Sequence, residues 1–274
     1  MQIKLICSDI DGTLLNKERE LSKRTITAIK NITPIPFILI SSRMPKAMLH
    51  LQEELNITQL PMIAYNGGLI TLQERVIQST EIEHHVSTGL ASFCDKTNIH
   101  LSLYHHNEWC VPAMDYWAKR ESNNTKVTPK VQDIKTTLKN WKNENKGAHK
   151  IMCMGDEKEI DTLVNHIKIN HHNKIIGYRS KPTYLEISHK DISKKTAIEF
   201  LIQLKYPNCT LKNIMAFGDN YNDIDMLKSV GISVAVQNAK DKVLAIANQV
   251  TESNIDDGVA IFLEENLNYK KQRI

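Results

Sequence analysis

Hydrophobic residues follow two different spacings along the first third of the chain. Ile3 to Ser8, Ile35 to Ser42 and Pro61 to Gly68 are short apolar runs, typical of buried strands. Between them, apolar residues three and four positions apart predict helices, one beginning after Ser22 and one opened by Pro45. Buried strands that alternate with helices predict a parallel sheet with helices on both faces.

The pattern changes after Ile82 and returns near residue 185. The stretch from His84 to His189 holds ten of the eleven histidines, all three tryptophans and several short aromatic strands. The alternation of strands and helices then resumes from the stretch TYLEIS to the end of the chain. This predicts two domains: a core formed by residues 1–82 and 185–274, and an inserted α+β domain formed by residues 83–184.

Composition narrows the class of protein. Hydrophobic residues make up 41% and charged residues 24% of the 274 positions, as expected for a folded domain with a sizeable core. The net charge of +4 is small and the basic residues are scattered, which argues against nucleic-acid binding. Five widely spaced cysteines without a CxxC pair, and no apolar run long enough for a membrane span or signal peptide, predict a cytoplasmic protein. The sequence does not indicate the oligomeric state.

The histidines invite a comparison with metal sites. Six of them form adjacent pairs, whose side chains diverge on a strand, and no cysteine accompanies them at zinc spacing. We therefore expect most of the histidines to be surface residues with ordinary hydrogen bonds.

Two acids follow the first predicted strand in the stretch SDIDGT. Asp9 and Asp11 stand at the strand end before Gly12, a residue that permits a sharp turn. They could serve only to form the turn, since aspartate side chains bond nearby amides. A calcium loop of the EF-hand type does not fit, because Leu14 stands where that loop requires glycine.

A second acidic group follows a later strand, in the stretch AFGDNYNDIDML. Asp219 and Asp223 lie four residues apart with Asn222 between them. Ligands of open parallel sheets gather at the carboxyl ends of the strands, so these acids could converge with Asp9 and Asp11. Their mutual repulsion would be relieved by a divalent cation, and oxygen ligands suit Mg²⁺.

Two further stretches could hold phosphate. Ser41 and Ser42 stand between a strand and a helix, where hydroxyl and amide groups can bind anions, although an ordinary helix cap has the same composition. Lys194 or Lys195 begins a helix, a position that is mildly unfavourable for a cation unless an anion lies opposite.

Taken together, the stretches DIDGT, SSR, SKKTA and GDNYND resemble the haloacid dehalogenase-like (HAD) hydrolases, specifically the Cof-type sugar-phosphate phosphatases. The resemblance spans nearly the whole chain and implies a Rossmann-like core with an inserted cap. It implies that Asp9 is the nucleophile, forming an aspartyl-phosphate, and that Asp11 is the acid and base. Mg²⁺ would be held by Asp9, the Asp11 backbone carbonyl, Asp219 and Asp223.

The resemblance also implies a phosphate-binding set, in which Lys194 is preferred to Lys195 by register. Its members are Ile10, Ser41, Ser42, Lys194 and Asn222, with Arg43 and Asn66 as additional candidates near the substrate; for Asn66, formation of a turn is an equal alternative. Two positions depart from the family pattern, since Ser42 replaces the usual glycine after the motif hydroxyl and Lys195 replaces the glycine after the motif lysine.

The sequence therefore predicts a magnesium-dependent phosphatase that hydrolyses small phosphorylated metabolites, most simply sugar phosphates. A phosphomutase, which returns the phosphoryl group to its substrate, is the nearest alternative. A non-catalytic sensor that binds a phosphorylated metabolite is another. The sequence does not specify which metabolite is bound.

Overall fold

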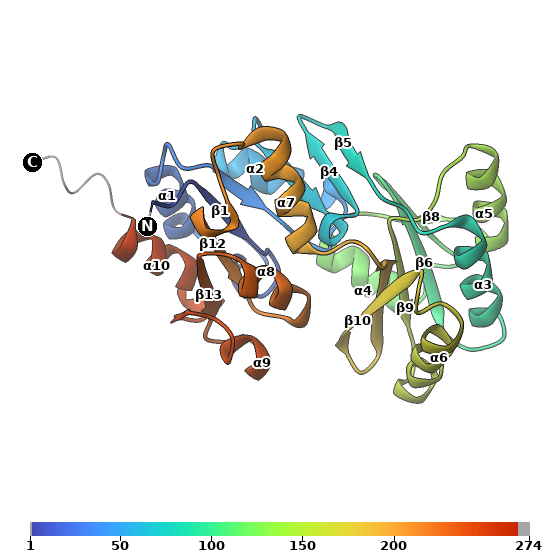
Figure 1. Cartoon of the computed structure of the whole chain (residues 1–274). Coiled ribbons are helices and arrows are strands. Elements are labelled where there is room, and N and C mark those ends of the chain that lie inside the picture. The colour runs from blue at the N-terminus through green and yellow to red at the C-terminus, as the bar shows by residue number, and fades with distance from the viewer. Residues whose placement is uncertain (1, 268–274) are drawn as a thin grey trace, which may run out of the picture. The chain divides into compact units, whose positions relative to one another are not determined.

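The structure is a computed structural model that describes residues 2–267, and the chain divides into two compact units (Figure 1). The first unit contains the described residues up to Ser42, Met48–Ile77 and the described residues from Ser193 onward. The second contains Arg43–Ala47 and Gln78–Ile192. The predicted fold class is confirmed: a parallel sheet with helices forms the core of one unit, and a mostly antiparallel sheet forms the other. The predicted limits of the inserted domain, 83–184, stay a proposal.

The first unit is built on a five-stranded parallel sheet with the order β14-β13-β12-β1-β2. All four residues of β1 are buried, as expected for a strand covered on both faces. Because the strands are parallel, their carboxyl ends lie along the same edge of the sheet. The strands are β1 (Leu5–Ser8), β2 (Phe37–Leu39), β12 (Ile214–Gly218), β13 (Ile232–Val236) and β14 (Gln249–Thr251).

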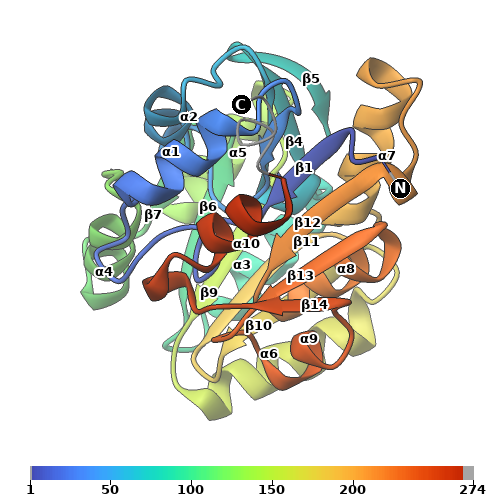
Figure 2. The same ribbon diagram turned by 90° about the vertical axis from the view of Figure 1, so that its left-hand side faces the viewer.

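The helices of this unit form two groups with the sheet between them (Figure 2). In one group α1 packs against α2 and α10, and in the other α7 packs against α8. Ser22 is the N-cap of α1, as predicted, and its hydroxyl accepts a hydrogen bond from the Thr25 amide at 3.0 Å. The helices are α1 (Lys23–Asn31), α2 (Leu49–Leu55), α7 (Lys194–Lys205), α8 (Ile224–Ser229), α9 (Asp241–Leu244) and α10 (Gly258–Asn266).

The segment after β2 differs from the prediction in two ways. The helix opened by Pro45 is a short 3-10 turn, Pro45–Ala47, and α2 begins separately at Leu49. The apolar run from Pro61 forms β3 (Pro61–Ala64), which meets the β2 segment through one parallel bridge between Ile40 and Ile63. It pairs instead with β4 (Leu69–Leu72) in a small sheet completed by β5 (Arg75–Ser79), two strands that the sequence pattern did not predict.

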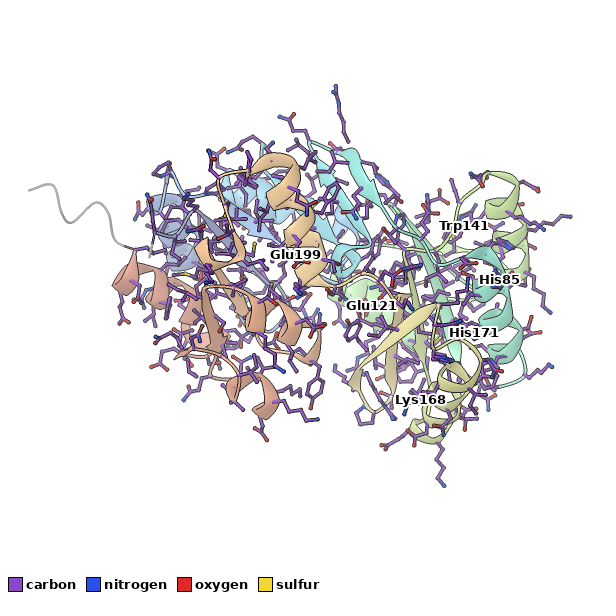
Figure 3. The ribbon with its side chains drawn as sticks, viewed as in Figure 1. His85, Glu121, Trp141, Lys168, His171 and Glu199 are labelled. Carbon is purple, nitrogen blue, oxygen red and sulfur yellow. The ribbon has the colours of Figure 1, made fainter. Side chains whose placement is uncertain are left out.

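The second unit is built on a six-stranded sheet with the order β10-β11-β9-β6-β7-β8. Alternate residues of its strands, such as Leu103, Ile151 and Ile187, enter a hydrophobic core that also contains Trp141 of α5 (Figure 3). Its elements are α3 (His84–Cys94), β6 (His100–His105), β7 (Glu108–Val111), α4 (Tyr116–Thr125), β8 (Lys130–Val131), α5 (Ile134–Asn143), β9 (Lys150–Met154), α6 (Glu157–Asn170), β10 (Ile175–Lys181) and β11 (Tyr184–His189).

Two histidines of this unit are buried rather than at the surface. His100 is 5% exposed and His149 is 1% exposed, and both take part in hydrogen bonds. The sequence pattern could not identify them, because their cover comes from distant parts of the unit. Within residues 2–267, no helix combines the length and apolar character needed to cross a membrane. The five cysteines are all buried and none forms a disulfide.

Candidate active site

The ends of three neighbouring strands bring the predicted site segments together. β1 lies between β12 and β2, so the residues that follow these strands are neighbours at one edge of the sheet. The Asp9 amide donates to the Phe217 carbonyl of β12 at 3.1 Å, and the Ile40 amide donates to the Ser8 carbonyl at 3.0 Å. These backbone bonds extend the sheet by one step beyond the strands. They fix Asp9 beside the segment that carries Asp219.

Asp9 is buried, and the chain turns directly after it. Asp9 is 5% exposed and Ile10 is fully buried, whereas Asp11 is half-buried and pairs with Arg19 at 3.4 Å. Gly12 adopts a φ of +81°, and a Cβ atom there would lie 2.6 Å from the Asp219 carboxylate. Only glycine combines that backbone angle with so close an approach. The turn therefore brings the segment after Asp9 against Asp219.

The Lys194 ammonium lies between two carboxylates of the candidate site. Its ammonium is fully buried and donates to Asp9 Oδ1 and, at 2.5 Å, to Asp223 Oδ1. Burial alone would lower the pKa of Lys194, but the carboxylates of Asp223 and Asp9 raise it above its ordinary value, so the ammonium stays charged. The Lys195 ammonium does not contact these carboxylates but pairs with Glu199 at 3.6 Å. Glu199 is labelled on α7 in Figure 3.

The beginning of α7 positions this lysine. Ser193 is the N-cap: its hydroxyl accepts from the Thr196 amide at 3.2 Å, and the Thr196 hydroxyl accepts from the Ser193 amide at 2.9 Å. This reciprocal capping box fixes the first turn of the helix. Lys194 is therefore held at the site although the helix dipole disfavours a cation there.

The loop after β12 holds the remaining two carboxylates. Asp223 is fully buried, and its Oδ2 accepts hydrogen bonds from the amides of Asp219 and Asn220, each at 3.0 Å. Asp219 accepts a hydrogen bond from the Thr13 hydroxyl at 3.0 Å. Burial and the neighbouring charge of Asp223 raise the pKa of Asp219 to about 7. Burial likewise raises the pKa of Asp9, against the opposing effect of Lys194.

These carboxylates fit a divalent cation. Oxygen atoms of Asp9, Asp219 and Asp223 lie within 4.8 Å of one another, and carboxylate oxygens are the ligands that Mg²⁺ prefers. Because three carboxylates surround one ammonium, negative charge is left over, and a cation would offset it. The Asp11 carboxylate lies outside this group and faces Arg19.

The two serines follow β2 at the same edge of the sheet, and Arg43 comes next in the chain, as the first residue of the second unit. Ser41 is buried, its amide donates to the Ile63 carbonyl at 3.0 Å, and its carbonyl accepts from the Asn66 amide at 2.8 Å. Ser42 is half-buried. Arg43 is 6% exposed, and its guanidinium donates to the Ala47 carbonyl at 3.1 Å, so it supports the backbone of the turn that follows.

Two asparagines link the third strand segment to the acidic loop. The Asn222 amide group donates to the Asn66 side-chain oxygen at 3.0 Å. Asn66 has a φ of +56°, a left-handed conformation that asparagine tolerates better than most residues. Next to it, Gly67 lies so close to α7 that a Cβ would come within 2.9 Å of the Ser193 carbonyl. Asn66 thus forms a turn and also contacts another predicted site residue.

Three polar residues around the Asp9 loop were not among the predicted site residues. Thr13 bonds Asp219, the Asn238 amide group donates to the Gly12 carbonyl at 2.7 Å, and the Asn254 amide group donates to the Leu15 carbonyl at 2.6 Å. Asn238 follows β13, so the position after a strand end, which identified Asp219, could also have identified it. Asn254 offered no such signal because it belongs to a 3-10 turn, Asn254–Asp256.

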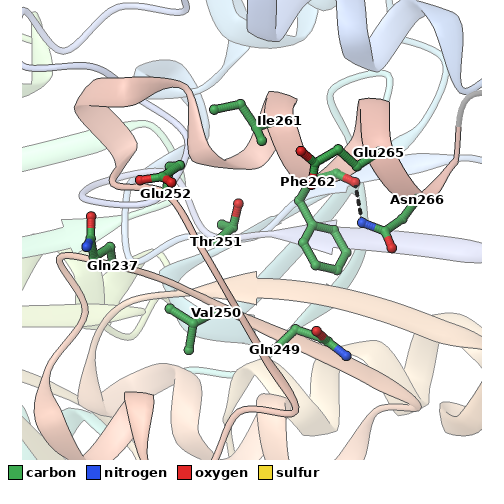
Figure 4. Close-up of a pocket in the computed structure, with 9 residues that line it drawn as sticks. All are labelled: Gln237, Gln249, Val250, Thr251, Glu252, Ile261, Phe262, Glu265 and Asn266. Carbon is green, nitrogen blue, oxygen red and sulfur yellow. Dashed lines mark hydrogen bonds between the residues drawn. The ribbon is translucent and has the colours of Figure 1, made fainter.

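A separate pocket lies between β14 and α10, with a cavity volume of about 450 Å³ (Figure 4). Its walls include Gln249, Thr251 and Phe262, and Asn266 donates a hydrogen bond to the Phe262 carbonyl at 2.9 Å. None of the predicted site residues lines it. The pocket therefore gives no reason to move the candidate site away from the strand ends.

Comparisons with known proteins support one family. A family model described as haloacid dehalogenase-like hydrolase matches residues 6–263. A Haemophilus influenzae protein named "Putative phosphatase" is 33% identical over 97% of this chain and 98% of its own length. A 5-amino-6-(5-phospho-D-ribitylamino)uracil phosphatase of Bacillus subtilis is 28% identical over 95% of this chain and 94% of its own length.

The fold of solved structures agrees with these sequence matches. A haloacid dehalogenase-like hydrolase from Bacteroides thetaiotaomicron superposes with a TM-score of 0.86 at 26% identity, covering 96% of this chain and 99% of its own. A Thermotoga maritima protein gives a TM-score of 0.83 at 27% identity, with 96% and 97% of the two chains covered.

Proposed function

Because the chain belongs to the haloacid dehalogenase-like hydrolases and its relatives carry phosphatase names, we propose that it is a magnesium-dependent phosphatase of small phosphorylated metabolites. One observation carries the proposal. The Asp9 carboxylate lies at the carboxyl end of β1, between β12 and β2, in contact with the Lys194 ammonium and grouped with Asp219 and Asp223. This arrangement suits a nucleophile that must meet an anionic phosphate.

In the first half of the proposed reaction, an Asp9 carboxylate oxygen attacks the phosphorus atom, and the bond from phosphorus to the ester oxygen breaks. Asp11 gives its proton to that oxygen, so an alcohol leaves and an aspartyl-phosphate remains on Asp9. The Asp11 side chain is 37% exposed, which lets it exchange protons with solvent.

In the second half, water attacks the phosphorus atom of the aspartyl-phosphate. Asp11, now a carboxylate, accepts the proton from that water, and the bond between Asp9 and phosphorus breaks. Inorganic phosphate and the free Asp9 carboxylate are the products. The same side chain acts first as acid and then as base, so both half-reactions depend on it.

Charge compensation is the main task of the surrounding residues. When bound by Asp9, Asp219, Asp223 and the Asp11 backbone carbonyl, Mg²⁺ would reduce the repulsion between the attacking carboxylate and the phosphate. Lys194 supplies a fixed positive charge, and we assign phosphate binding to it together with Ile10, Ser41, Ser42 and Asn222. Arg43 and Asn66 belong to the proposal as residues that support the loops around this set.

The substrate class rests on the family and on one named relative. The Bacillus subtilis relative is named for a phosphate ester of a ribityl group, a polyhydroxylated chain. We extend this to sugar phosphates and related small phosphate esters as the substrates of this chain. A cytoplasmic location is part of the proposal and rests on five cysteines that form no disulfide.

The test is phosphate release from a panel of phosphorylated metabolites, with and without Mg²⁺. We expect Mg²⁺-dependent release by the wild type and a loss of roughly 10⁴-fold or more in kcat for Asp9→Asn, as for other enzymes that lose their nucleophile. Asp225→Asn is the matched control, because Asp225 is an exposed acid two positions beyond Asp223. It should keep full activity.

Three results would contradict the proposal. Formation of an isomeric phosphate without release of inorganic phosphate would indicate a phosphomutase. Binding without turnover, equal in the wild type and Asp9→Asn, would indicate a sensor. Substantial residual hydrolysis by Asp9→Asn would show that another group attacks phosphorus.

A further inference from the structure

The segment that follows β13 contacts both loops that carry the acids of the candidate site. β13 lies beside β12 in the parallel sheet, so its carboxyl end belongs to the same edge (Figure 2). Just beyond that end, the side-chain amide group of Asn238 donates to the Gly12 carbonyl at 2.7 Å. The Lys240 amide donates to the Asp219 carbonyl at 2.9 Å. The segment therefore supports the turn after Asp9 with a side chain and the loop of Asp219 with its backbone.

The hydrogen bonds of Asn238 determine how its side-chain amide group is oriented. Its Oδ1 atom accepts from the Asn254 backbone amide at 2.9 Å and from the Ser253 hydroxyl at 3.2 Å. A backbone amide only donates and a backbone carbonyl only accepts, so the oxygen faces Asn254 and the nitrogen faces Gly12. Asparagine provides both groups in one short side chain. An aspartate carboxylate has the same shape but no N–H to donate to Gly12.

The Gly12 carbonyl is an effective place to hold this turn. Because glycine has no Cβ, its backbone has more conformational freedom than that of any other residue, and Gly12 adopts a φ of +81°. The turn closes through a bond from the Leu15 amide to the Ile10 carbonyl at 3.1 Å, which does not involve Gly12. The bond from Asn238 therefore restrains the carbonyl of the residue that directly follows Asp11.

We propose that Asn238 is a positioning residue for the proton transfer from Asp11 to the leaving group. This inference rests on the proposed phosphatase function, in which Asp11 protonates the ester oxygen. The Asp11 side chain is 37% exposed and its ion pair with Arg19 is exposed as well, so its position depends mainly on the backbone that carries it. Asn238 restrains that backbone. A displacement of about 1 Å in a reacting group can cost roughly 100-fold in rate.

The nucleophile is held by other contacts. Asp9 is 5% exposed, its amide donates to the Phe217 carbonyl at 3.1 Å, and its carboxylate accepts from the buried Lys194 ammonium. Loss of the Asn238 contact should therefore leave the attacking carboxylate in place and displace the acid. The expected defect is confined to esters whose leaving oxygen needs a proton from Asp11.

Two kinds of phosphate ester distinguish a displaced acid from a displaced nucleophile. A sugar hydroxyl is a poor leaving group and must be protonated as its bond to phosphorus breaks, whereas p-nitrophenolate leaves as a stable anion. Both esters form the same aspartyl-phosphate, so the second half-reaction is common to them. Because kcat/KM covers the steps up to that intermediate, the two kcat/KM values together measure how far the first half-reaction depends on the acid.

The test is to measure kcat/KM of the full chain, in saturating Mg²⁺, for p-nitrophenyl phosphate and for the sugar phosphate of the panel that the wild type hydrolyses fastest. Asn238→Ala removes the contacts of the side-chain amide group, and Asn238→Asp removes only its donor. Each substitution should lower kcat/KM about tenfold or more for the sugar phosphate and less than about threefold for p-nitrophenyl phosphate.

Asn248→Ala is the matched control and should leave both kcat/KM values unchanged. Asn248 is also an exposed asparagine that bonds the backbone beside β13, since its Oδ1 atom accepts from the Ser233 amide at 3.1 Å. Ser233 lies near the amino end of β13, away from the strand ends that carry the acids. The control therefore separates the loss of a similar hydrogen bond from the loss of the contact with Gly12.

With a wild type that hydrolyses both esters, three results would overturn the inference and leave the proposed function standing. They are unchanged kcat/KM values in both Asn238 variants, equal losses for the two esters, and a loss in Asn238→Asp alone, which would trace the effect to its added charge. A wild type that hydrolyses neither ester would contradict the proposed function and this inference with it.

A second variant keeps the inference testable if neither Asn238 variant folds. Ser253→Ala removes one of the contacts that orient the Asn238 amide group. It should lower kcat/KM for the sugar phosphate more than for p-nitrophenyl phosphate, by a smaller factor than the Asn238 substitutions. Full activity of Ser253→Ala toward both esters would then overturn the inference.

Discussion

Lys194 keeps its charge inside the protein because two carboxylates meet it there. Its side chain has no solvent exposure, and the two carboxylates are 8% and 0% exposed. Removing one member of such a group leaves uncompensated charge in a buried place. Substitution of Lys194 should therefore lower the free energy of unfolding far more than substitution of Lys195.

We predict that Lys194→Met lowers the free energy of unfolding by about 3 kcal/mol, measured by urea denaturation in EDTA. Lys195→Met should change it by less than about 0.5 kcal/mol, because its pair with Glu199 is 39% and 38% exposed. Equal effects of the two substitutions would show that the buried ammonium is not what stabilises the site.

The buried imidazole of His149 should make stability depend on pH. Its pKa is lowered from 6.5 to about 3, because burial disfavours the protonated ring and His105 and His106 lie nearby. Between these values the unfolded chain binds a proton that the folded chain does not. The contribution is therefore fully present above about pH 6.5 and is lost as the pH falls towards 3.

We predict that this group alone removes up to about 1.4 kcal/mol of stability for each pH unit between pH 6 and 4. The measurement is urea denaturation in EDTA at several pH values, compared with His149→Gln, which cannot titrate. The stability curve of the wild type should fall more steeply than that of the variant. Parallel curves would mean that His149 is protonated in the folded protein.

At the scale of the helix, the cap of α7 connects local structure to the site. Ser193 and Ser22 cap α7 and α1 with the same contact, a hydroxyl that accepts from the amide three residues on. Only Ser193 precedes a site residue. Comparing alanine substitutions of these two serines therefore separates the general effect of losing a helix cap from the effect of displacing Lys194.

We predict that Ser193→Ala and Ser22→Ala each lower the free energy of unfolding by about 1 kcal/mol. Only Ser193→Ala should also lower kcat, because the capping box fixes the turn that carries Lys194. Thermal unfolding and steady-state phosphate release measure the two effects. An equal fall in kcat for both variants would contradict a positioning role for Ser193.

The elements that the sequence predicted best have a strong local signal. β1, β12 and β13 are continuous apolar runs, and α1 follows a serine cap, so pattern and structure agree there. The polar stretch that became α4 shows no apolar face, and Ala118 is its only buried residue. Its helix depends on the Asp115 cap and on tertiary packing, which residue spacing does not reveal.

The residues of the site also divide into those with a local sequence signal and those that depend on contacts between distant segments. Asp9, Asp219 and Ser41 could be located because each follows an apolar strand, and parallel strands end at one edge. The residues alone left the choice between Lys194 and Lys195 open, and the resemblance favoured Lys194 by register; in the structure Lys194 contacts Asp9, whereas Lys195 pairs with Glu199. Outside the site, the burial of His149 beside His105 depends on long-range strand pairing, so the adjacent histidine pairs in the sequence gave no sign of it.

At the scale of the whole molecule, the site depends on contacts between the two ends of the chain. Thr13 bonds Asp219, 206 positions away, and Lys194 bonds Asp9, 185 positions away. An ion that binds these segments together binds the folded chain and not the unfolded one. Metal binding and global stability should therefore be linked.

We predict that EDTA stops phosphate release and that Mg²⁺ restores it. We also predict that Mg²⁺ at 100 times its Kd adds about 2.7 kcal/mol to the free energy of unfolding. Thermal unfolding with increasing Mg²⁺ measures the gain. Asp219→Asn should require more Mg²⁺ for the same gain, because it removes a carboxylate of the cluster. Full activity in EDTA would contradict a metal-dependent site.

The central claim is that Asp9 accepts the phosphoryl group, and its most direct test is to trap that adduct. The protein is mixed with substrate and Mg²⁺, quenched during turnover and treated with borohydride, which reduces an acyl phosphate to an alcohol. Mass spectrometry of the peptides should locate the reduced side chain at residue 9, and only when substrate was present. Active turnover with no modification at Asp9, or with the modification on another residue, would contradict the account.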